Sequence, residues 1–267
     1  MVKRVLNYPG SKWTIADWIV QHMPQHDSYL EPFFGSGAVF FQKERSVIET
    51  VNDLDGNVVN LFSVIRDRGN ELARLIQMTP WARDEYELGY DAAVEDPLES
   101  ARRFLVRCWQ AVGNKLCQRT GWKKDIVQTK KYYPGMWNDL PYRILAIATR
   151  LKETQIENQD AFKLIPRYND RRVLIYADPP YMLGVRCSKQ YNLELTEWEH
   201  GFLLDLLSQH RGPVIISAYD NPLYKDRLRD WRRLSINTYT FGARPRQEVI
   251  YLNRTAVQGM DDGAGSV

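Results

Sequence analysis

The sequence predicts an α/β fold in which a parallel sheet is interrupted by a mainly helical insertion. Two short apolar runs, at residues 29–34 and 173–177, predict buried strands, and each is followed by glycines or prolines that stop a strand. Between residues 61 and 154 apolar residues recur at helical spacing, which predicts the insertion. Ligands of open α/β sheets bind at the carboxyl ends of the strands, so the residues at those ends are the functional candidates.

The stretch Asp178-Pro179-Pro180-Tyr181 directly follows the second apolar run. Proline cannot donate a hydrogen bond to a neighbouring strand, so the strand must end at Asp178. The residue before a proline is extended, which places this carboxylate at the sheet edge beside free carbonyl groups and an aromatic ring. The alternative is a proline-rich turn in which Asp178 has no functional role. The motifs elsewhere in the chain are needed to distinguish these two interpretations.

Composition narrows the class of protein. A formal net charge of +3 and a pI of about 8.6 do not by themselves indicate a nucleic-acid partner. No apolar run approaches the roughly 18 residues of a membrane-spanning helix, and the amino terminus is too polar for a signal peptide. Three cysteines without C-x-x-C spacing predict no disulfide or zinc site and favour the cytoplasm. His22 and His26 lack a third ligand, so no metal is expected.

The first candidate loop runs from Tyr8 to Lys12 and turns at Gly10. Ser11 is expected to cap a helix that starts near Lys12. The same residues could form an anion-binding loop at a helix amino terminus, with Lys12 supplying the charge. The sequence alone does not separate these interpretations.

A Gly-x-Gly turn, Gly35 to Gly37, follows the first strand with its residues Glu31 and Phe33, and a helix is expected after the turn. Glycine lets the backbone reach positive φ and approach a ligand closely. The third glycine of the dinucleotide-binding pattern is replaced by Phe40. A pyrophosphate is therefore disfavoured, and a smaller nucleoside ligand fits better.

An acidic residue ends the second predicted strand, residues 46–53. Asp53 lies about 15–20 residues after the glycine turn, where doubly wound folds carry an acid that binds ribose hydroxyls. Asp53 or Asp55 could instead cap the helix predicted over residues 56–66, but ribose binding by Asp53 is favoured.

A basic segment with aromatic neighbours lies inside the predicted insertion. Residues 115–133 contain six basic side chains and one acidic side chain. The basic residues are Lys115, Arg119, Lys123, Lys124, Lys130 and Lys131, and the neighbouring aromatic residues are Trp122, Tyr132, Tyr133 and Trp137. Basic groups pair with phosphates and aromatic rings stack on bases, so the segment predicts contact with nucleic acid. A solvated basic loop with core aromatic residues is the alternative.

Strand patterns resume after the insertion. Residues 156–162 read as a strand followed by a turn at Asp160, and Thr196 with Glu199 predicts the capped start of a helix that reaches residue 207. Later strands are expected at residues 213–217, 231–240 and 248–253, and the basic loop between the last two carries Arg244 and Arg246. From residue 257 the composition predicts a disordered tail.

Together, these motifs resemble the DNA adenine-N6 methyltransferases of the Dam type, the D12 class, which place target recognition between cofactor and catalytic motifs. The motifs are Tyr8-Pro9-Gly10-Ser11-Lys12, Glu31-Pro32-Phe33-Phe34-Gly35-Ser36-Gly37 and Asp178-Pro179-Pro180-Tyr181, with Asn52-Asp53 before the last. Each alone is weak, but their order across residues 5–253 is specific. The resemblance implies a Rossmann-like, S-adenosylmethionine-dependent methyltransferase sheet with an inserted, mainly helical DNA-recognition domain.

The resemblance also implies a division of the chain and a substrate. Residues 1–62 and 155–256 would form the catalytic and cofactor-binding domain, residues 63–154 the target-recognition insertion, and residues 257–267 the disordered tail. The substrate would be double-stranded DNA in the cytoplasm of a bacterium or a phage host. A monomer is favoured, and the sequence does not determine whether the protein dimerises.

Roles follow by matching position. Cofactor contacts are implied for Tyr8, Gly10, Lys12, Glu31, Phe33, Gly35, Gly37, Asp53, Asp160, Phe162 and Asp178. Catalytic roles are implied for Asp178, Pro179, Pro180 and Tyr181, and DNA contacts for Lys115, Arg119, Lys123, Lys124, Lys130, Arg244 and Arg246. Tyr8 and Lys12 would border the methionine end of the cofactor, while Asp160 and Phe162 would border its adenine. Many relatives have a Trp and two glycines around Tyr8, which is a departure here.

Two alternatives stay open on the sequence. Cytosine-N4 methylation uses the same amine chemistry, although those enzymes usually carry Ser in place of Asp178. A catalytically silent DNA-binding regulator could retain the fold. Cytosine-C5 methylation needs a nucleophilic cysteine, usually after a proline, and no cysteine of this chain follows a proline. The target sequence and any partner nuclease are not determined by the sequence.

Overall fold

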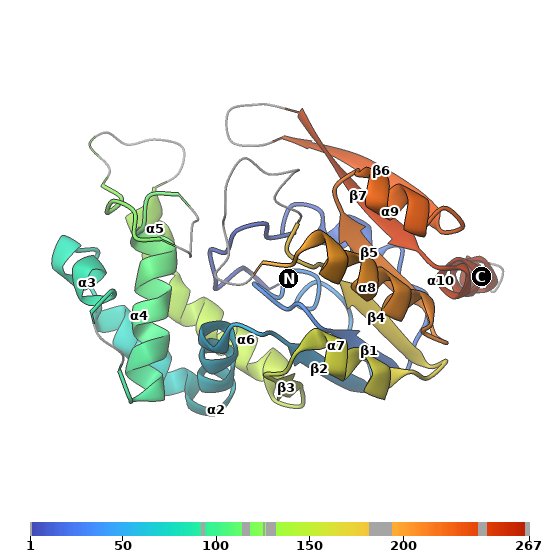
Figure 1. Ribbon diagram of the computed structural model, residues 1–267. Helices are drawn as coiled ribbons and strands as arrows, with labels where there is room; N and C mark the ends of the chain where they lie inside the picture. Colours follow the sequence, from blue (N-terminus) through green and yellow to red (C-terminus); the bar gives the residue numbers. More distant parts are fainter. Residues whose placement is uncertain are drawn as a thin grey trace.

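The computed structural model describes residues 2–91, 94–113, 118–124, 126, 132–181, 194–239 and 245–264. Within these residues, seven strands form one sheet in the order β3-β2-β1-β4-β5-β7-β6 (Figure 1). The strands are β1 Ser28–Glu31, β2 Ile48–Asn52, β3 Gln155–Glu157, β4 Val173–Ala177, β5 Val214–Ala218, β6 Arg232–Tyr239 and β7 Pro245–Leu252. The pairs from β3 to β5 are parallel, and β7 and β6 are antiparallel additions at one edge. The predicted α/β fold is confirmed.

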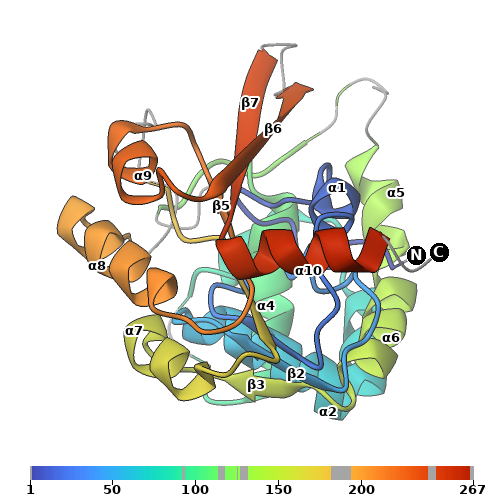
Figure 2. The ribbon, with the colours of Figure 1, turned by 90° about the vertical axis from the view of Figure 1, so that its right-hand side faces the viewer.

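Successive side chains of each strand point to opposite faces of the sheet, which explains why helices cover both faces. Tyr29 of β1 packs in one apolar cluster with Tyr176 of β4, whereas Leu30 and Ile175 pack in a second cluster. Successive side chains of a strand point to opposite faces, so a fully apolar run needs helices on both sides. Figure 2 shows this arrangement, with α7 and α8 on one side of the sheet and α6 and α10 on the other.

Helices connect most strands of the sheet domain, and the described part of the insertion is mainly helical. They are α1 Ala16–Val20, α2 Gly56–Met78, α3 Arg83–Leu88, α4 Pro97–Gln110, α5 Tyr133–Asn138, α6 Leu140–Leu151, α7 Ala161–Leu164, the 3-10 helix Ile165–Tyr168, α8 Glu197–Ser208, α9 Pro222–Arg227 and α10 Arg254–Ala264. The helix predicted from Thr196 is confirmed, including its reciprocal cap with Glu199.

The insertion shares its core with the sheet. Helix α2 begins beside the end of β2 and continues into the insertion, where it packs against α4 and α6 (Figure 1). The predicted boundary after residue 62 therefore falls inside this helix. The helix departs from helical geometry at Arg68, with φ −132° and ψ 32°. One apolar cluster contains both Val51 of β2 and Trp109 of α4, so the insertion is packed on the sheet domain.

Two local predictions near the amino terminus are wrong. The expected helix near Lys12 begins only at Ala16, and Ser11 does not cap it but shares a hydrogen bond with Ser36 Oγ at 2.7 Å. Residues 38–42, expected to be helical, form consecutive turns. Phe34, Phe40 and Phe41 pack their rings together there, with centroids 5.1–5.9 Å apart. Burial of successive side chains on all sides outweighs helix propensity at this place.

The predicted disordered tail is also wrong for residues 257–264, which belong to α10. Asn253 starts this helix by accepting a hydrogen bond from the Ala256 amide at 2.9 Å. Ala256 is buried, and Val257 and Met260 pack against the main core. The glycine and aspartate content of the segment conceals this apolar helix face in the sequence.

A buried cluster of charges joins α6 to the sheet. Glu49 of β2 accepts hydrogen bonds from Lys43 Nζ at 2.6 Å and from Arg150 of α6 at 2.7 Å. The Arg150 guanidinium also lies 3.9 Å from the centroid of the Phe40 ring. Burial alone would raise the pKa of Glu49, but the hydrogen bonds from Arg150 and Lys43 outweigh it and lower the pKa. The cluster ties the returning helix of the insertion to the strand that leads to Asp53.

Candidate functional site

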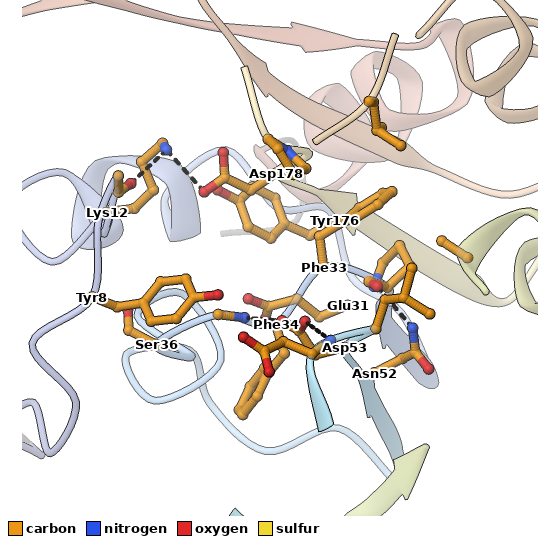
Figure 3. Close-up of a pocket in the computed structure, with 18 of the residues that line it drawn as sticks. Tyr8, Lys12, Glu31, Phe33, Phe34, Ser36, Asn52, Asp53, Tyr176 and Asp178 are labelled. Carbon is orange, nitrogen blue, oxygen red and sulfur yellow. Dashed lines mark hydrogen bonds and ion pairs between the residues drawn. The ribbon is translucent and has the colours of Figure 1, made fainter. Parts of the chain in front are cut away.

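A cavity of about 300 Å³ lies at the carboxyl edge of the parallel strands. Its size falls within the range of about 300–1,000 Å³ that is usual for ligand sites. The residues that line it are 8–12, 31–36, 38–39, 52–55, 160–162, 194, 195 and 199, together with Tyr176, Asp178 and Pro180. Figure 3 shows labelled side chains from several of these segments around the same space. The structure thus brings together most of the residues expected to bind a cofactor.

Lys12 and Asp178 meet across this cavity. Lys12 Nζ lies 2.8 Å from Asp178 Oδ2 and donates a second hydrogen bond to the Gly10 carbonyl at 2.9 Å (Figure 3). Gly10 has φ 65°, and the turn points the Lys12 side chain inward, where it is only 6% exposed. The lysine charge therefore pairs with a carboxylate in this structure.

Glycines are required in the second turn for two different reasons. Gly35 and Gly37 have φ of 50° and 64°, which other residues rarely adopt. A Cβ atom on Gly35 would lie 3.2 Å from the Tyr8 ring at the cavity, whereas one on Gly37 would lie 2.5 Å from the Phe34 ring. Gly35 lines the cavity and Gly37 does not, so Gly37 is needed for packing behind it.

Asp53 and Asp55 perform different tasks. Asp55 caps α2 by accepting a hydrogen bond from the Asn57 amide at 2.9 Å. Asp53 lines the cavity and accepts hydrogen bonds from the amides of Gly35 at 2.7 Å and Asp55 at 2.9 Å. Burial raises the pKa of Asp53 to about 6, although these amide hydrogen bonds oppose the shift. Asp55 is therefore the cap of α2, and both carboxylates line the cavity.

Glu31 is a buried carboxyl group on the floor of the cavity. It is 2% exposed, and the Tyr29 hydroxyl donates to its Oε2 at 2.6 Å. Burial raises the pKa of Glu31 to about 8, the Tyr29 hydrogen bond opposes this shift, and the negative charge of Asp178 adds to it. Glu31 is therefore mostly protonated at neutral pH in the protein without a ligand.

Asn52 is a site residue for which the sequence predicted no role. Its side-chain amide donates to the carbonyl oxygens of Pro32 at 2.9 Å and Gln159 at 3.0 Å, and its Oδ1 accepts from the Gln159 amide at 2.8 Å. It joins the carboxyl ends of β1, β2 and β3. Its place beside Asp53 was the only signal, because both partners are distant in the chain.

Asp160 and Phe162 line the cavity from the start of α7. Asp160 caps α7 by accepting a hydrogen bond from the Phe162 amide at 2.9 Å. Further residues line the cavity that the sequence did not select, among them Leu54, Glu194, Leu195 and Glu199. Leu54, Phe162 and Leu195 offer apolar surface that suits a flat ring, beside the carboxylates of Asp160, Glu194 and Glu199.

Tyr181 does not line the cavity but packs beside it. The ring is 8% exposed, its centroid lies 4.0 Å from that of Tyr219, and Lys12 Nζ lies 4.6 Å from its centroid. Asp178 and Pro180 line the cavity, whereas Pro179 and Tyr181 do not. Lys12 is therefore in contact with both the carboxylate and the aromatic ring of this motif.

The residues predicted to contact DNA are only partly described. Lys115, Lys130 and Arg244 lie outside the described residues, as does the side chain of Arg246. Arg119 and Lys124 are exposed. Lys123 is used internally: its Nζ donates to the Trp109 carbonyl at 3.1 Å and lies 4.0 Å from the centroid of the Tyr133 ring.

Buried polar contacts hold the segment 118–124 on the insertion. Trp122 Nε1 donates to Gln110 at 3.1 Å, and Trp81 Nε1 donates to the Lys123 carbonyl at 2.9 Å. Gln110 is fully buried at the end of α4. These contacts present Lys124 outward on a rigid base.

Two other kinds of feature are absent from the described part of the chain. No cluster of three or more histidine, cysteine or acidic residues there has the arrangement of a metal site. None of the helices there is both long and apolar enough to cross a membrane.

Comparison with known proteins gives a consistent result. Residues 8–240 match a protein family described as D12 class N6 adenine-specific DNA methyltransferase. The chain is 29% identical to the DNA adenine methylase of Escherichia coli K12, covering 83% of this chain and 82% of that protein. It is 25% identical to the DNA adenine methylase of Salmonella typhimurium, covering 86% and 84%. The type II methyltransferase M.MjaIII of Methanocaldococcus jannaschii is 25% identical, covering 67% and 69%.

Proposed function

Because the chain belongs to the D12 class of N6 adenine-specific DNA methyltransferases, we propose that its cavity binds S-adenosylmethionine and that Asp178 and Pro179 hold the target amine. The enzyme methylates adenine in DNA and uses S-adenosylmethionine as its cofactor. The observation that carries the assignment of residues is the meeting of Glu31, Asp53 and Asp178 around one cavity.

The cavity suits this cofactor chemically. Carboxylates attract the positive charges of the cofactor and accept hydrogen bonds from its ribose, and Asp53 is placed for the ribose. Tyr8, Gly10 and Lys12 border the methionine end, near Glu31. Phe33 and Phe162 line the cavity with Leu54 and Leu195, an apolar setting for the adenine ring. No third glycine is present to hold a pyrophosphate, which the cofactor does not have.

Catalysis requires the exocyclic nitrogen of adenine, a poor nucleophile, to attack the methyl group of the cofactor. The exocyclic nitrogen of adenine shares its lone pair with the ring. Asp178 and the Pro179 carbonyl can each accept one N–H, which favours a tetrahedral nitrogen and stabilises the positive charge that develops on it. The cofactor supplies a methyl group already activated by its sulfonium. Asp178 is also placed to accept the proton that the methylated nitrogen releases.

Lys12 has to move before the base can bind in this way. In the structure its ammonium group contacts Asp178 Oδ2 and covers the Tyr181 ring. The target base must leave the duplex stack, which costs a few kcal/mol. We propose that displacement of Lys12 exposes both the carboxylate and one face of Tyr181, and that stacking on this ring returns about 1–3 kcal/mol.

The direct test is transfer of tritiated methyl from S-adenosylmethionine to unmethylated genomic DNA, followed by analysis of the nucleosides. N6-methyladenine is the expected product. Label on cytosine would select N4 methylation, and no label on any DNA would select a silent DNA-binding regulator of the same fold.

We further propose that residues 63–154 read the target sequence on double-stranded DNA and that the enzyme acts as a monomer in the cytoplasm. The match of residues 8–240 to a DNA methyltransferase family and the exposed basic side chains of the insertion support this. Residues 1–62 and 155–256 would then hold the cofactor and the reacting base.

Replacing Lys124 by alanine should weaken DNA binding and reduce the slope of log K against log salt by about 0.9, since one phosphate contact would be lost. Lys152→Ala is the matched control, because Lys152 is an exposed lysine between α6 and β3, outside the basic segment 115–133. Fluorescence anisotropy of a labelled duplex at several salt concentrations measures the slope. An equal slope for Lys124→Ala and the unchanged protein would contradict phosphate contact by Lys124.

Cofactor binding at pH 7 should release about one proton, because Glu31 has its pKa raised to about 8 and a cationic ligand favours its ionised form. Calorimetric titration in buffers of different ionisation enthalpy measures this number. Glu31→Gln should bind with close to no proton release. Equal release by both proteins would show that Glu31 does not ionise when the cofactor binds.

A further inference from the structure

Two large aromatic side chains on α8 are left exposed beside the cavity wall. Trp198 is 75% exposed and Phe202 is 45% exposed. Their rings are parallel within 1°, with centroids 5.7 Å apart. Residues four apart on a helix share a face, so this stack runs along the outer side of α8. Neither ring belongs to an apolar core cluster of the described residues, so core packing does not explain the pair.

The stack continues into the cavity wall. The Phe202 ring lies 5.5 Å from the Phe162 ring, at an angle of 51°. Phe162 lines the cavity, and its partner on α8 comes from a segment 40 positions further along the chain. Figures 1 and 2 both show α7 and α8 side by side. The order Trp198–Phe202–Phe162 therefore leads from solvent to the ligand site.

Helix α8 is a firm support for this stack. Its first turn is held by the reciprocal cap of Thr196 and Glu199, with hydrogen bonds of 3.2 and 2.7 Å. Leu203, Leu204 and Leu207 are fully buried on its inner face. Helix α7, in contrast, has only four residues and ends after Leu164. Phe162 on this short helix gains lateral support from Phe202 that α7 alone does not supply.

We infer that Phe202 and Trp198 are positioning residues that hold the Phe162 ring against the adenine of the bound cofactor. This rests on the proposed placement of the adenine beside Phe162. Aromatic pairs in tilted or offset geometry add to affinity beyond their area of contact. The stack acts through Phe162, so it contributes to binding of the adenosine end of the ligand and not to the methyl transfer step.

Phe202→Ala should raise the Kd of S-adenosylmethionine, S-adenosylhomocysteine and 5′-methylthioadenosine by a similar factor of about 3 to 10. The turnover number at saturating cofactor and the KM for DNA should stay unchanged, and Phe202→Tyr should restore the affinity. Tyr142→Ala is the matched control, since Tyr142 is an aromatic residue 74% exposed on α6. Trp198→Phe should remove part of the change in tryptophan fluorescence that cofactor binding produces.

The Kd values of Phe202→Ala and Phe162→Ala decide between the possible outcomes. An unchanged Kd for all three ligands in Phe202→Ala would overturn the inference, as would a lower melting temperature of the ligand-free protein without a change in Kd. Phe162→Ala separates the inference from its premise. If Phe162→Ala leaves the Kd unchanged, the placement of the adenine is wrong. If Phe162→Ala weakens binding and Phe202→Ala does not, the placement stands and the positioning role fails.

Discussion

Replacing Asp178 by alanine should lower the rate of methyl transfer by at least about 10³-fold while cofactor affinity changes only a few-fold. The carboxylate is the group that accepts an N–H of the target amine and stabilises the charge developing on it, and losing one such group costs about 10²–10³ in rate. Loss of proton acceptance adds to this. Single-turnover transfer of tritiated methyl measures the rate, and calorimetry measures cofactor binding.

Two variants control for indirect effects of this change. Asp170→Ala removes an exposed carboxylate that pairs with Arg172 ahead of β4, and should leave the rate unchanged. Lys12→Met removes the cation that faces Asp178 at 2.8 Å, and combined with Asp178→Ala it avoids an unpaired buried charge. Turnover of Asp178→Ala near that of the unchanged enzyme would refute the catalytic role.

Replacing Glu49 by alanine should lower the free energy of unfolding by about 3–5 kcal/mol, because it leaves two buried cations without their carboxylate. Lys43 and Glu49 are both 3% exposed, and Arg150 is 13% exposed. Urea denaturation measures the change as a shift of the midpoint at constant slope. Because Arg150 also contacts Phe40, the variant should loosen the attachment of α6 as well.

The neighbouring pair of Arg45 and Glu153 is a control of the same chemistry at the surface. Glu153 is 76% exposed, so Glu153→Ala should change the free energy of unfolding by less than about 1 kcal/mol. Similar values for Glu49→Ala and Glu153→Ala would mean that the buried cluster contributes no more than an exposed ion pair.

The free energy of unfolding should decrease at low pH because Glu49 becomes protonated. Its pKa in the folded protein lies below the ordinary value of 4.5, so its contribution is present above pH 4.5 and is lost as the pH falls through the lowered pKa. Glu49→Gln should flatten this acid limb. Glu31, whose pKa is raised to about 8, acts in the opposite sense: its contribution falls as the pH rises from about 4.5 to 8.

Local rules of chain geometry made much of the site predictable. Prolines that cannot pair end β4 at Ala177, directly before Asp178, and glycines at positive φ mark the turn at Gly35. An acid at the end of β2 marked Asp53. These are properties of a few adjacent residues, so they can be read from the sequence, and their order in the chain carried the resemblance to a family.

Rules based on neighbouring residues gave wrong or incomplete predictions where contacts between distant segments determine a residue's role. The sequence left open whether Asp53 or Asp55 caps α2, because the answer depends on the Gly35 amide, which binds Asp53. The sequence predicted DNA contact for both Lys123 and Lys124. In the structure, the Trp109 carbonyl and the Tyr133 ring bind the ammonium group of Lys123. The tail was read as disordered from its composition, although its apolar face packs on the core as α10.

The order of motifs along the chain was enough to predict the class of fold, the family chemistry and the carboxylates at the sheet edge. The contacts between these groups became visible only in the folded protein: Lys12 on Asp178, Tyr29 on Glu31, and Phe202 beside Phe162. This difference arises because strand ends and turns depend on backbone geometry over a few residues. Ion pairs, buried carboxyl groups and ring stacks depend on packing between segments that the sequence keeps far apart.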